Sequence, residues 1–380
     1  MFQNLGDDIM NNINVNPHMK YGFIGLGLIG ASIAKALRRV YSDCYIIAYN
    51  RSESARTMAL NDGVANVVTD KVDETFKDCD YIFLCTPVEY NLEYLKILKT
   101  IIKPTCIITD VGSVKAGIHK AVIELDLEAN FIGGHPMAGS EKTGYESSTD
   151  RLVENAFYVI TPTLKTEENK LLEYKAIAEA IGAIPIILDY DQHDYAVAGI
   201  SHLPHIIAVE LVNLVKASDS DNGIMKLIAA GGFKDITRIA SSSPEMWEQI
   251  FMTNTDNIIS LLDDYINMLG QVKSNLLDKN GSFINERFRQ SREYRDQFTD
   301  SSRNSMVKMY TIYVDIVDEI GTLACVVSLL SSKGLSIKNI RIVNNRELDA
   351  GVLAIDFKDE SSLTEAAKVL EAHHYKIYQR

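Results

Sequence analysis

The chain has 380 residues, of which 46% are hydrophobic and 23% are charged, a globular composition with room for two or three domains. Its net charge of −13 argues against a nucleic-acid-binding protein, because the phosphate backbone needs a basic face. Its apolar runs stay short of a bilayer span and its five cysteines form no C-x-x-C pair, so we expect a cytoplasmic protein without membrane segments, disulfides or a bound metal.

Short apolar runs alternate with amphipathic stretches in the first half of the chain. We expect helices at Ile29–Arg39 and Glu53–Asp62, and strands at Tyr21–Gly25, Tyr45–Tyr49, Tyr81–Cys85, Cys106–Thr109, Phe131–Gly134, Tyr158–Thr161 and Ile184–Leu188. Such alternation is typical of an α/β fold with a mostly parallel, doubly wound sheet. Residues 19–190 should form this domain, behind a flexible tail of residues 1–18.

The pattern becomes helical near Asp191. Ile206–Val215 is apolar on nearly every face, and Trp247–Val272 has apolar residues every three or four positions, as buried helices do. Long apolar helices often bury against a second subunit. We therefore expect residues 191–300 to form an all-helical dimerisation domain of a homodimer.

A compact βαββαβ pattern ends the chain. It follows the charged segment Gly281–Asn304, which we interpret as a helix end and linker. The expected strands and helices alternate as Tyr310–Ile316, Thr322–Lys333, Ile337–Asn344, Gly351–Phe357, Ser362–His373 and Tyr375–Tyr378. Residues 301–380 should therefore form an α+β domain of the ferredoxin-like kind.

The run GFIGLGLIG places Gly25, Gly27 and Gly30 after the first strand and at the start of the first helix. In a G-x-G-x-x-G turn the first glycine permits the tight turn, the second admits a pyrophosphate and the third lets helix and strand pack closely. The helix N-terminus then binds the phosphates. A Rossmann-type cofactor site is predicted, with a ligand-free glycine turn as the alternative. Its predicted residues are Gly25, Gly27, Leu28, Ile29, Gly30, Thr86 and Pro87.

The end of the second strand bears on the choice of cofactor. An acidic residue there binds the ribose diol of NAD, whereas this chain has Asn50, Arg51 and Ser52. A missing acid with a nearby arginine suits a 2′-phosphate. We expect an NAD(P) site that favours NADP over NAD and uses these three residues, unless Arg51 is only a solvated loop residue.

Four further motifs resemble the prephenate and arogenate dehydrogenases in order and spacing. They are TDVGSVK (Thr109–Lys115), GGHPMAGSE (Gly133–Glu141), SHLPH (Ser201–His205) and GGFKDITR (Gly231–Arg238). The resemblance covers about Lys20 to Asn275, and the segment from Tyr310 is similar to an amino-acid-sensing ACT domain. The dehydrogenase resemblance implies NAD(P)-dependent oxidative decarboxylation of prephenate to 4-hydroxyphenylpyruvate in tyrosine biosynthesis. Arogenate dehydrogenase and a catalytically inactive amino-acid sensor are the alternatives.

The resemblance also implies roles for single residues. His135 would accept the proton of the substrate hydroxyl, since an imidazole pKa of ~6.5 lies near working pH. Ser113 would hydrogen-bond to His135 or to that hydroxyl, with a helix N-cap as its alternative. Arg238 would bind a substrate carboxylate through its planar guanidinium, with an ordinary pair to Asp235 as the alternative.

The same motifs imply four further substrate-binding residues, which are His202, His205, Lys234 and Glu141. His202 and His205 are three residues apart, but a metal between them is disfavoured because no acid or cysteine motif lies beside them. A plain surface charge is the alternative for Glu141.

The ACT-like segment predicts an effector site. Asp318 and Gly321 lie between its first strand and first helix, where backbone atoms can approach a ligand closely. The resemblance implies tyrosine or phenylalanine as the effector. A module that only supports the dimer is the alternative.

Overall fold

The computed structural model describes residues 15–139, 142–300, 310–317, 319, 321–343, 351–357 and 359–378. The predicted site residues Glu141 and Asp318 lie outside these ranges. The chain divides into two compact units, Met1–Asn267 and Met268–Arg380. The predicted domain boundaries stay predictions.

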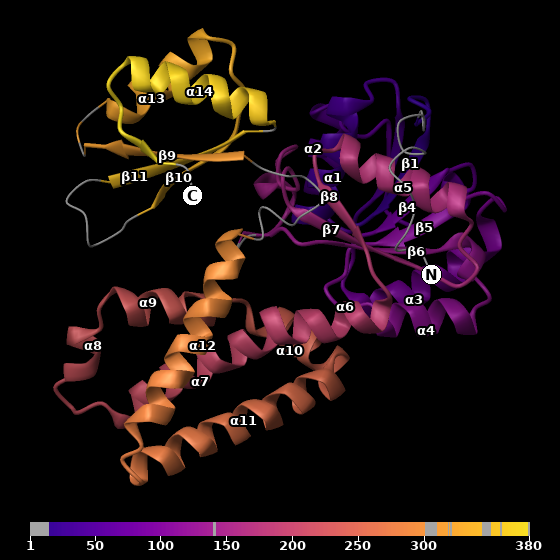
Figure 1. Ribbon diagram of the computed structural model, residues 1–380. Coiled ribbons are helices and arrows are strands. Elements are labelled where there is room, and N and C mark those ends of the chain that lie inside the picture. Colours follow the sequence, from indigo (N-terminus) through magenta and orange to yellow (C-terminus); the bar gives the residue numbers. More distant parts are fainter. Residues whose placement is uncertain are drawn as a thin grey trace. The chain divides into compact units, whose positions relative to one another are not determined.

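A five-stranded parallel sheet organises the first unit, as the sequence predicts (Figure 1). Its order is β3-β2-β1-β4-β5, where the strands are β1 (Lys20–Ile24), β2 (Tyr45–Tyr49), β3 (Val67–Thr69), β4 (Tyr81–Leu84) and β5 (Ile107–Asp110). This order reverses direction between β1 and β4, which is where a doubly wound sheet binds its ligand.

Helices cover both faces of this sheet. On one face, Tyr21 and Phe23 pack with α1 (Leu28–Val40), α2 (Glu53–Asn61) and α5 (Glu168–Ala180). On the other face, Ile24 and Leu84 pack with α3 (Val88–Ile101) and α4 (Ala116–Glu124). Successive strand residues thus enter opposite cores, as the pleat requires.

The last three predicted strands of this half form a sheet of their own, in the order β6-β7-β8. β6 (Ile132–Pro136) is antiparallel to β7 (Phe157–Pro162), which is parallel to β8 (Ile184–Ile187). A single bridge between Ile108 and Phe131 joins β5 to this second sheet. The end of β6, which carries His135, therefore lies beside the end of β5.

One long helix leaves the second sheet. α6 (Tyr190–Val197), a π turn η5 (Ala198–His202) and α7 (Leu203–Ser218) follow one another without a break. Pro204 has no N–H for the i−4 carbonyl, and the π turn ends two residues before it; such turns occur at many functional sites. Tyr190–Ser218 is long and apolar enough to cross a membrane, but one such helix is weak evidence because core helices of soluble proteins pass the same test.

The rest of the predicted helical region is confirmed. It contains α8 (Ile224–Ile228), α9 (Gly231–Thr237), the 3-10 turn η6 (Arg238–Ser241), α10 (Pro244–Thr253) and α11 (Thr255–Leu277). The apolar stretch Trp247–Val272 is interrupted at Asn254, between α10 and α11. Asn254 is buried and its side chain serves the site described below.

The second unit corrects one expectation. Gly281–Asn304, interpreted as a helix end and linker, is mostly the helix α12 (Gly281–Asp300). Arg289 pairs with Glu286 at 2.6 Å and with Glu293 at 2.7 Å, and such i±3 and i+4 pairs support a polar, exposed helix.

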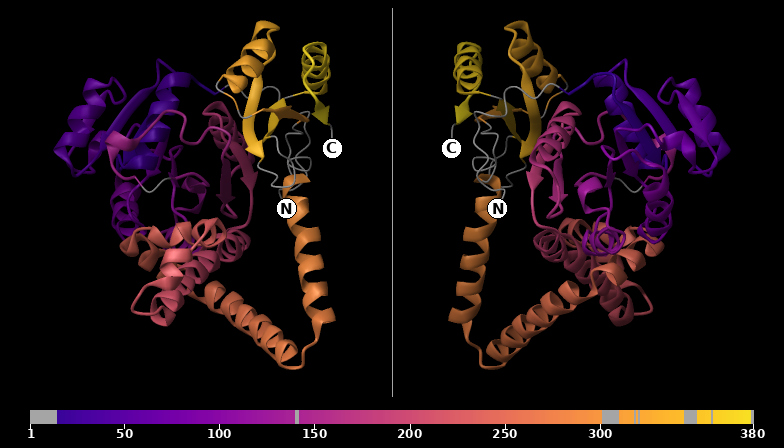
Figure 2. Two further views of the ribbon diagram at one scale, coloured as in Figure 1. Left: turned by 90° about the vertical axis from the view of Figure 1, so that its left-hand side faces the viewer. Right: turned by 90° about the vertical axis from the view of Figure 1, so that its right-hand side faces the viewer.

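The predicted βαββαβ order follows α12. Its antiparallel sheet has the order β10-β11-β9-β12, and both helices pack on one face of it (Figure 1, Figure 2). The elements are β9 (Tyr310–Ile316), α13 (Thr322–Ser332), β10 (Ile337–Val343), β11 (Gly351–Phe357), α14 (Glu360–Ala372) and β12 (Ile377–Tyr378). This is the ferredoxin-like arrangement expected of the segment.

Candidate active site

The three glycines between β1 and α1 have different surroundings. Gly25 has a φ of +104°, and a Cβ there would lie 2.7 Å from the Cys85 carbonyl oxygen. A Cβ on Gly30 would lie 2.3 Å from the Gly25 oxygen, whereas one on Gly27 would have nothing within 4 Å. Gly25 and Gly30 are therefore needed for packing. Gly27 leaves open space at the N-terminus of α1, where unpaired N–H groups can hold a pyrophosphate, so these residues fit a dinucleotide.

This difference gives a prediction for two alanine variants. Gly30→Ala should lower the free energy of unfolding by about 1–3 kcal/mol, because the added methyl meets backbone atoms. Gly27→Ala should unfold like the parent but bind the dinucleotide more weakly. Urea unfolding and a fluorescence titration with the cofactor measure the two effects. A stable Gly30→Ala, or a Gly27→Ala with unchanged affinity, would contradict the assignment.

The residues after β2 hold the loop together. The Asn50 side-chain oxygen accepts from Leu26 N at 3.3 Å, so it braces the glycine turn. The Ser52 hydroxyl caps α2 by accepting from Ala55 N at 3.3 Å. Arg51 is exposed and lies over the Tyr90 ring, 5.4 Å from its centroid.

Thr86 and Pro87 border the same turn. A Cβ on Gly25 would lie 3.0 Å from the Thr86 methyl carbon, and Pro87 is the N-cap of α3. The Thr86 hydroxyl donates to the Asn91 side-chain oxygen at 2.8 Å. Of the predicted cofactor residues, Asn50 and Thr86 are thus brought against the glycine turn.

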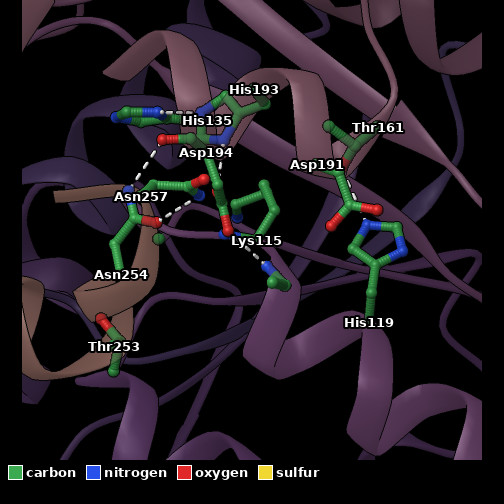
Figure 3. A network of polar contacts seen from close by, with 12 residues as sticks. Lys115, His119, His135, Thr161, Asp191, His193, Asp194, Thr253, Asn254 and Asn257 are labelled. Atoms are coloured by element: carbon green, nitrogen blue, oxygen red, sulfur yellow. Dashed lines mark hydrogen bonds and ion pairs between the residues drawn. The ribbon is translucent and has the colours of Figure 1, made fainter. Parts of the chain in front are cut away.

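His135 lies near the end of β6 and is 9% exposed. Its Nδ1 is 2.8 Å from Nε2 of His193, and Nδ1 of His193 is 2.7 Å from the Asp194 carboxylate (Figure 3). That carboxylate also accepts from the backbone N–H groups of Lys115 and Ala116, each at 2.8 Å. The chain of three side chains ties β6 to α6 and to the start of α4. His193 and Asp194 were not predicted from the sequence.

A buried ion pair fixes the strand that carries His135. The Lys115 ammonium bonds to the Asp110 carboxylate and, at 2.7 Å, to the Gly134 oxygen. Asp110 also accepts from Gly134 N at 3.2 Å. Burial lowers the pKa of Lys115 although Asp110 raises it.

The imidazole of His135 is held neutral by its surroundings. Burial lowers its pKa well below 6.5, and the nearby groups His193, Lys115 and His202 add to this effect. A neutral imidazole has a free lone pair, so His135 can accept a proton at neutral pH.

The two histidines of SHLPH have separate surroundings. His202 is buried, which lowers its pKa to about 4, and its Nδ1 lies 3.2 Å from the Asn254 amide nitrogen. His205 donates from Nδ1 to the Ser201 oxygen at 2.8 Å, and its ring stacks on Trp247 with centroids 3.6 Å apart. Among the described residues the buried indole nitrogen of Trp247 has no partner. Sequence reasoning did not identify Asn254 or Trp247.

The remaining predicted residues Lys234, Arg238 and Ser113 lie on α9, on η6 and in the loop before α4. Burial is the main cause that lowers the pKa of His205, and Arg238, at the start of η6, lowers it further. Lys234 is exposed on α9, and Ser113 is half-buried in the loop between β5 and α4. The N-cap alternative for Ser113 is not seen, because Lys115 is the cap residue and Asp194 binds the first N–H groups of α4. Within the described ranges, no group of histidine, cysteine and acidic residues could hold a metal ion.

Comparison with known proteins decides the family. Two family models match in succession, the nucleotide-binding domain of prephenate dehydrogenase over residues 33–187 and its dimerization domain over residues 189–290. Prephenate dehydrogenase of Bacillus subtilis is 34% identical over 350 residues, which are 92% of this chain and 94% of that protein. The chain belongs to the prephenate dehydrogenase family. It is accordingly a nicotinamide-dinucleotide-dependent oxidoreductase, as predicted.

Solved structures of this family agree with the fold. Prephenate dehydrogenase from A. aeolicus, in complex with hydroxyphenyl propionate and NAD⁺, is 32% identical. The match covers 74% of this chain and 98% of that one, with a TM-score of 0.68. Synechocystis arogenate dehydrogenase is 33% identical, with 74% and 100% covered and a TM-score of 0.67. Prephenate and arogenate enzymes thus both occur among similar structures.

Proposed function

We propose that this chain oxidises prephenate to 4-hydroxyphenylpyruvate and CO₂, with His135 as the general base. The observation that carries the proposal is the buried, neutral imidazole at the end of β6, in the same unit as a glycine turn that fits a dinucleotide. The hydrogen-bonded contacts of His135 also disfavour the catalytically inactive sensor, because such a protein would not need a base held in a fixed position.

The reaction needs a hydride acceptor, which the nicotinamide supplies when bound. The turn from Gly25 to Gly30 and the N-terminus of α1 would hold its pyrophosphate. As the ring carbon loses hydride, His135 takes the hydroxyl proton, and we assign to the Ser113 hydroxyl a hydrogen bond to His135 or to the substrate hydroxyl. The ring carboxylate then leaves as CO₂. Its bonding electrons complete the aromatic ring, and the phenol oxygen regains a proton.

Prephenate carries two carboxylates, which need cationic or hydrogen-bonding partners. We assign Arg238 to one carboxylate because a guanidinium can bind it through two bonds. Arg238 lies close enough to His205 to contribute to the lowered pKa of that imidazole, after burial, which supports assigning both to one pocket. The remaining substrate-binding residues in the proposal are His202, His205, Lys234 and Glu141. We propose prephenate and not arogenate as the substrate because the Bacillus subtilis relative is a prephenate dehydrogenase and matches this chain over nearly its whole length.

The preference for NADP over NAD is a finer proposal, and it rests on the missing acid at Asn50 and on the exposed Arg51. Asn50→Asp combined with Arg51→Ala should shift the ratio of kcat/KM values towards NAD, because a carboxylate accepts from the 2′-hydroxyl and repels a 2′-phosphate. Steady-state kinetics with both cofactors measure the ratio. Arg39→Ala is the control, since Arg39 is another exposed arginine of this unit and pairs with Asp150 at 3.2 Å. A parent enzyme that already prefers NAD by a wide margin would contradict the proposal.

A homodimer is proposed from the exposed apolar residues of the helical region. Ile200 is 71% exposed, Leu214 62% and Leu227 81%, which is unfavourable in water and typical of an interface. The matching family model over residues 189–290 is a dimerization domain. We therefore assign the apolar helix Tyr190–Ser218 to packing against a second copy in the cytoplasm. The domain division at residues 19–190, 191–300 and 301–380 belongs to the same proposal.

Feedback by tyrosine or phenylalanine at the C-terminal module is proposed near Gly321, with Asp318. Gly321 has a φ of +93°, and a Cβ added there would meet no atom within 4 Å. Asparagine adopts a positive φ more often than most other residues with a side chain and would fill that space, so Gly321→Asn should weaken inhibition by tyrosine while basal kcat stays unchanged.

Inhibition curves of the full-length variant test this. Gly334→Asn is the matched control, because Gly334 also has a positive φ of +73° and open space in the same module. Inhibition that stays unchanged and purely competitive with prephenate in Gly321→Asn would place tyrosine in the active site and exclude the effector role.

A further inference from the structure

The proposed reaction gives no role to His193 and Asp194, the side chains that are hydrogen-bonded in series to His135. Asp194 accepts three hydrogen bonds, from His193 Nδ1 at 2.7 Å and from the Lys115 and Ala116 N–H groups at 2.8 Å. All three use Asp194 as an acceptor, as an ionised carboxylate does. His193 and Asp194 are each 1% exposed, so water cannot take the place of either partner.

These contacts determine which nitrogen of each imidazole carries a proton. Nδ1 of His193 faces a carboxylate and is therefore the donor. In a neutral imidazole the other nitrogen must then accept. Nε2 of His193 faces Nδ1 of His135 at 2.8 Å, so Nδ1 of His135 must donate. The lone pair of His135 is left on Nε2.

We propose that Asp194 and His193 are positioning residues that hold His135 in its Nδ1–H tautomer, so that Nε2 is the atom that accepts the substrate proton. This proposal rests on His135 being the base. The same logic operates in Ser-His-Asp triads, where a buried carboxylate selects the tautomer of the histidine. Here the carboxylate acts through a second imidazole.

The chain of side chains also provides for the charge that forms during the reaction. When Nε2 takes a proton, His135 becomes cationic, while its Nδ1–H still donates to His193 and His193 still donates to Asp194. The Asp194 carboxylate therefore stabilises the cation through two hydrogen bonds. The other ionisable groups near His135 are His202 and Lys115, and Lys115 is already paired with Asp110. Asp194 is thus the carboxylate hydrogen-bonded to this chain of side chains.

A purely structural role is the competing explanation, because Asp194 also holds the start of α4 and accepts from Asn254 through its backbone oxygen at 2.7 Å. Substitution of Asp194 would mix both effects. His193 separates them, because its Nε2 contacts His135. A glutamine amide reaches about as far as Nε2 of histidine, whereas an asparagine amide reaches only as far as Nδ1.

The test compares His193→Gln with His193→Asn in the full-length enzyme. General base catalysis contributes ~10²–10⁴-fold, so the asparagine variant, which cannot contact His135, should lose about 10- to 100-fold in kcat. The glutamine variant should keep most of kcat, because its oxygen can accept from Nδ1 of His135. The KM for prephenate and the Kd for the cofactor should change little in both. Equal kcat values, or a change in KM alone, would overturn the proposal.

Two controls complete the design. His119 is equally buried at 1% but bonds to Thr161 at 2.9 Å, apart from this chain of side chains (Figure 3), so His119→Gln and His119→Asn should not differ in kcat. ¹⁵N spectra of histidine-labelled parent enzyme should show His135 protonated at Nδ1. Protonation at Nε2 would overturn the proposal without any variant. Failure of His135 as the base appears separately, as full activity in His135→Asn.

Discussion

His135→Asn is expected to lower kcat by about 10²–10⁴-fold, the usual contribution of a general base. The affinities for cofactor and prephenate should stay close to those of the parent, because the side chain is replaced by a smaller polar one and its neighbours remain in place. Stopped assays measure kcat, and fluorescence titration measures cofactor binding. A wild-type kcat would end the assignment of His135.

The pH dependence of the parent enzyme gives a second test of the same assignment. Only the neutral imidazole can accept a proton, and burial sets the pKa of His135 well below 6.5. The acid limb of kcat/KM should therefore lie below pH 6.5, since protonation inactivates the base only as pH falls through this lowered pKa. In His135→Asn this limb should disappear from the residual activity.

Arg238→Gln is expected to raise the KM for prephenate by roughly 30-fold or more, because loss of one partner of a bound ion pair costs about 2–5 kcal/mol. The lower end of that range applies, since Arg238 is exposed in the single chain. Cofactor affinity should not change. Initial-rate kinetics at varied prephenate, with a separate cofactor titration, give both quantities. A fall in cofactor affinity with unchanged KM would move Arg238 to the other site.

The fold was largely predictable because its signals are local. The strands Tyr45–Tyr49, Tyr310–Ile316 and Gly351–Phe357 have the bounds predicted from their apolar patterns. The pairing of strands is not local, so the separate sheet β6-β7-β8 could not be predicted from apolar runs. α12 was misjudged because its charge suggested a linker, although its ion pairs at helical spacing support a helix.

The glycine turn and His135 were found because their motifs are contiguous. His193, Asp194 and Asn254 could not be predicted because they lie far from the His135 motif in the sequence, and only the folded chain brings them close to it. Little in the sequence pointed to them, since His193 and Asp194 stand in the largely polar run of residues 189–194 at the start of the long helix, where polar residues are usually solvated.

The most direct test of the proposed reaction is an absorbance assay at the reduced-nicotinamide band, with prephenate or arogenate and each of NAD and NADP. We expect reduction of the cofactor with prephenate, with release of CO₂ and formation of 4-hydroxyphenylpyruvate. Faster turnover of arogenate would contradict the choice of substrate. No reduction with either substrate and either cofactor would contradict the proposed reaction itself.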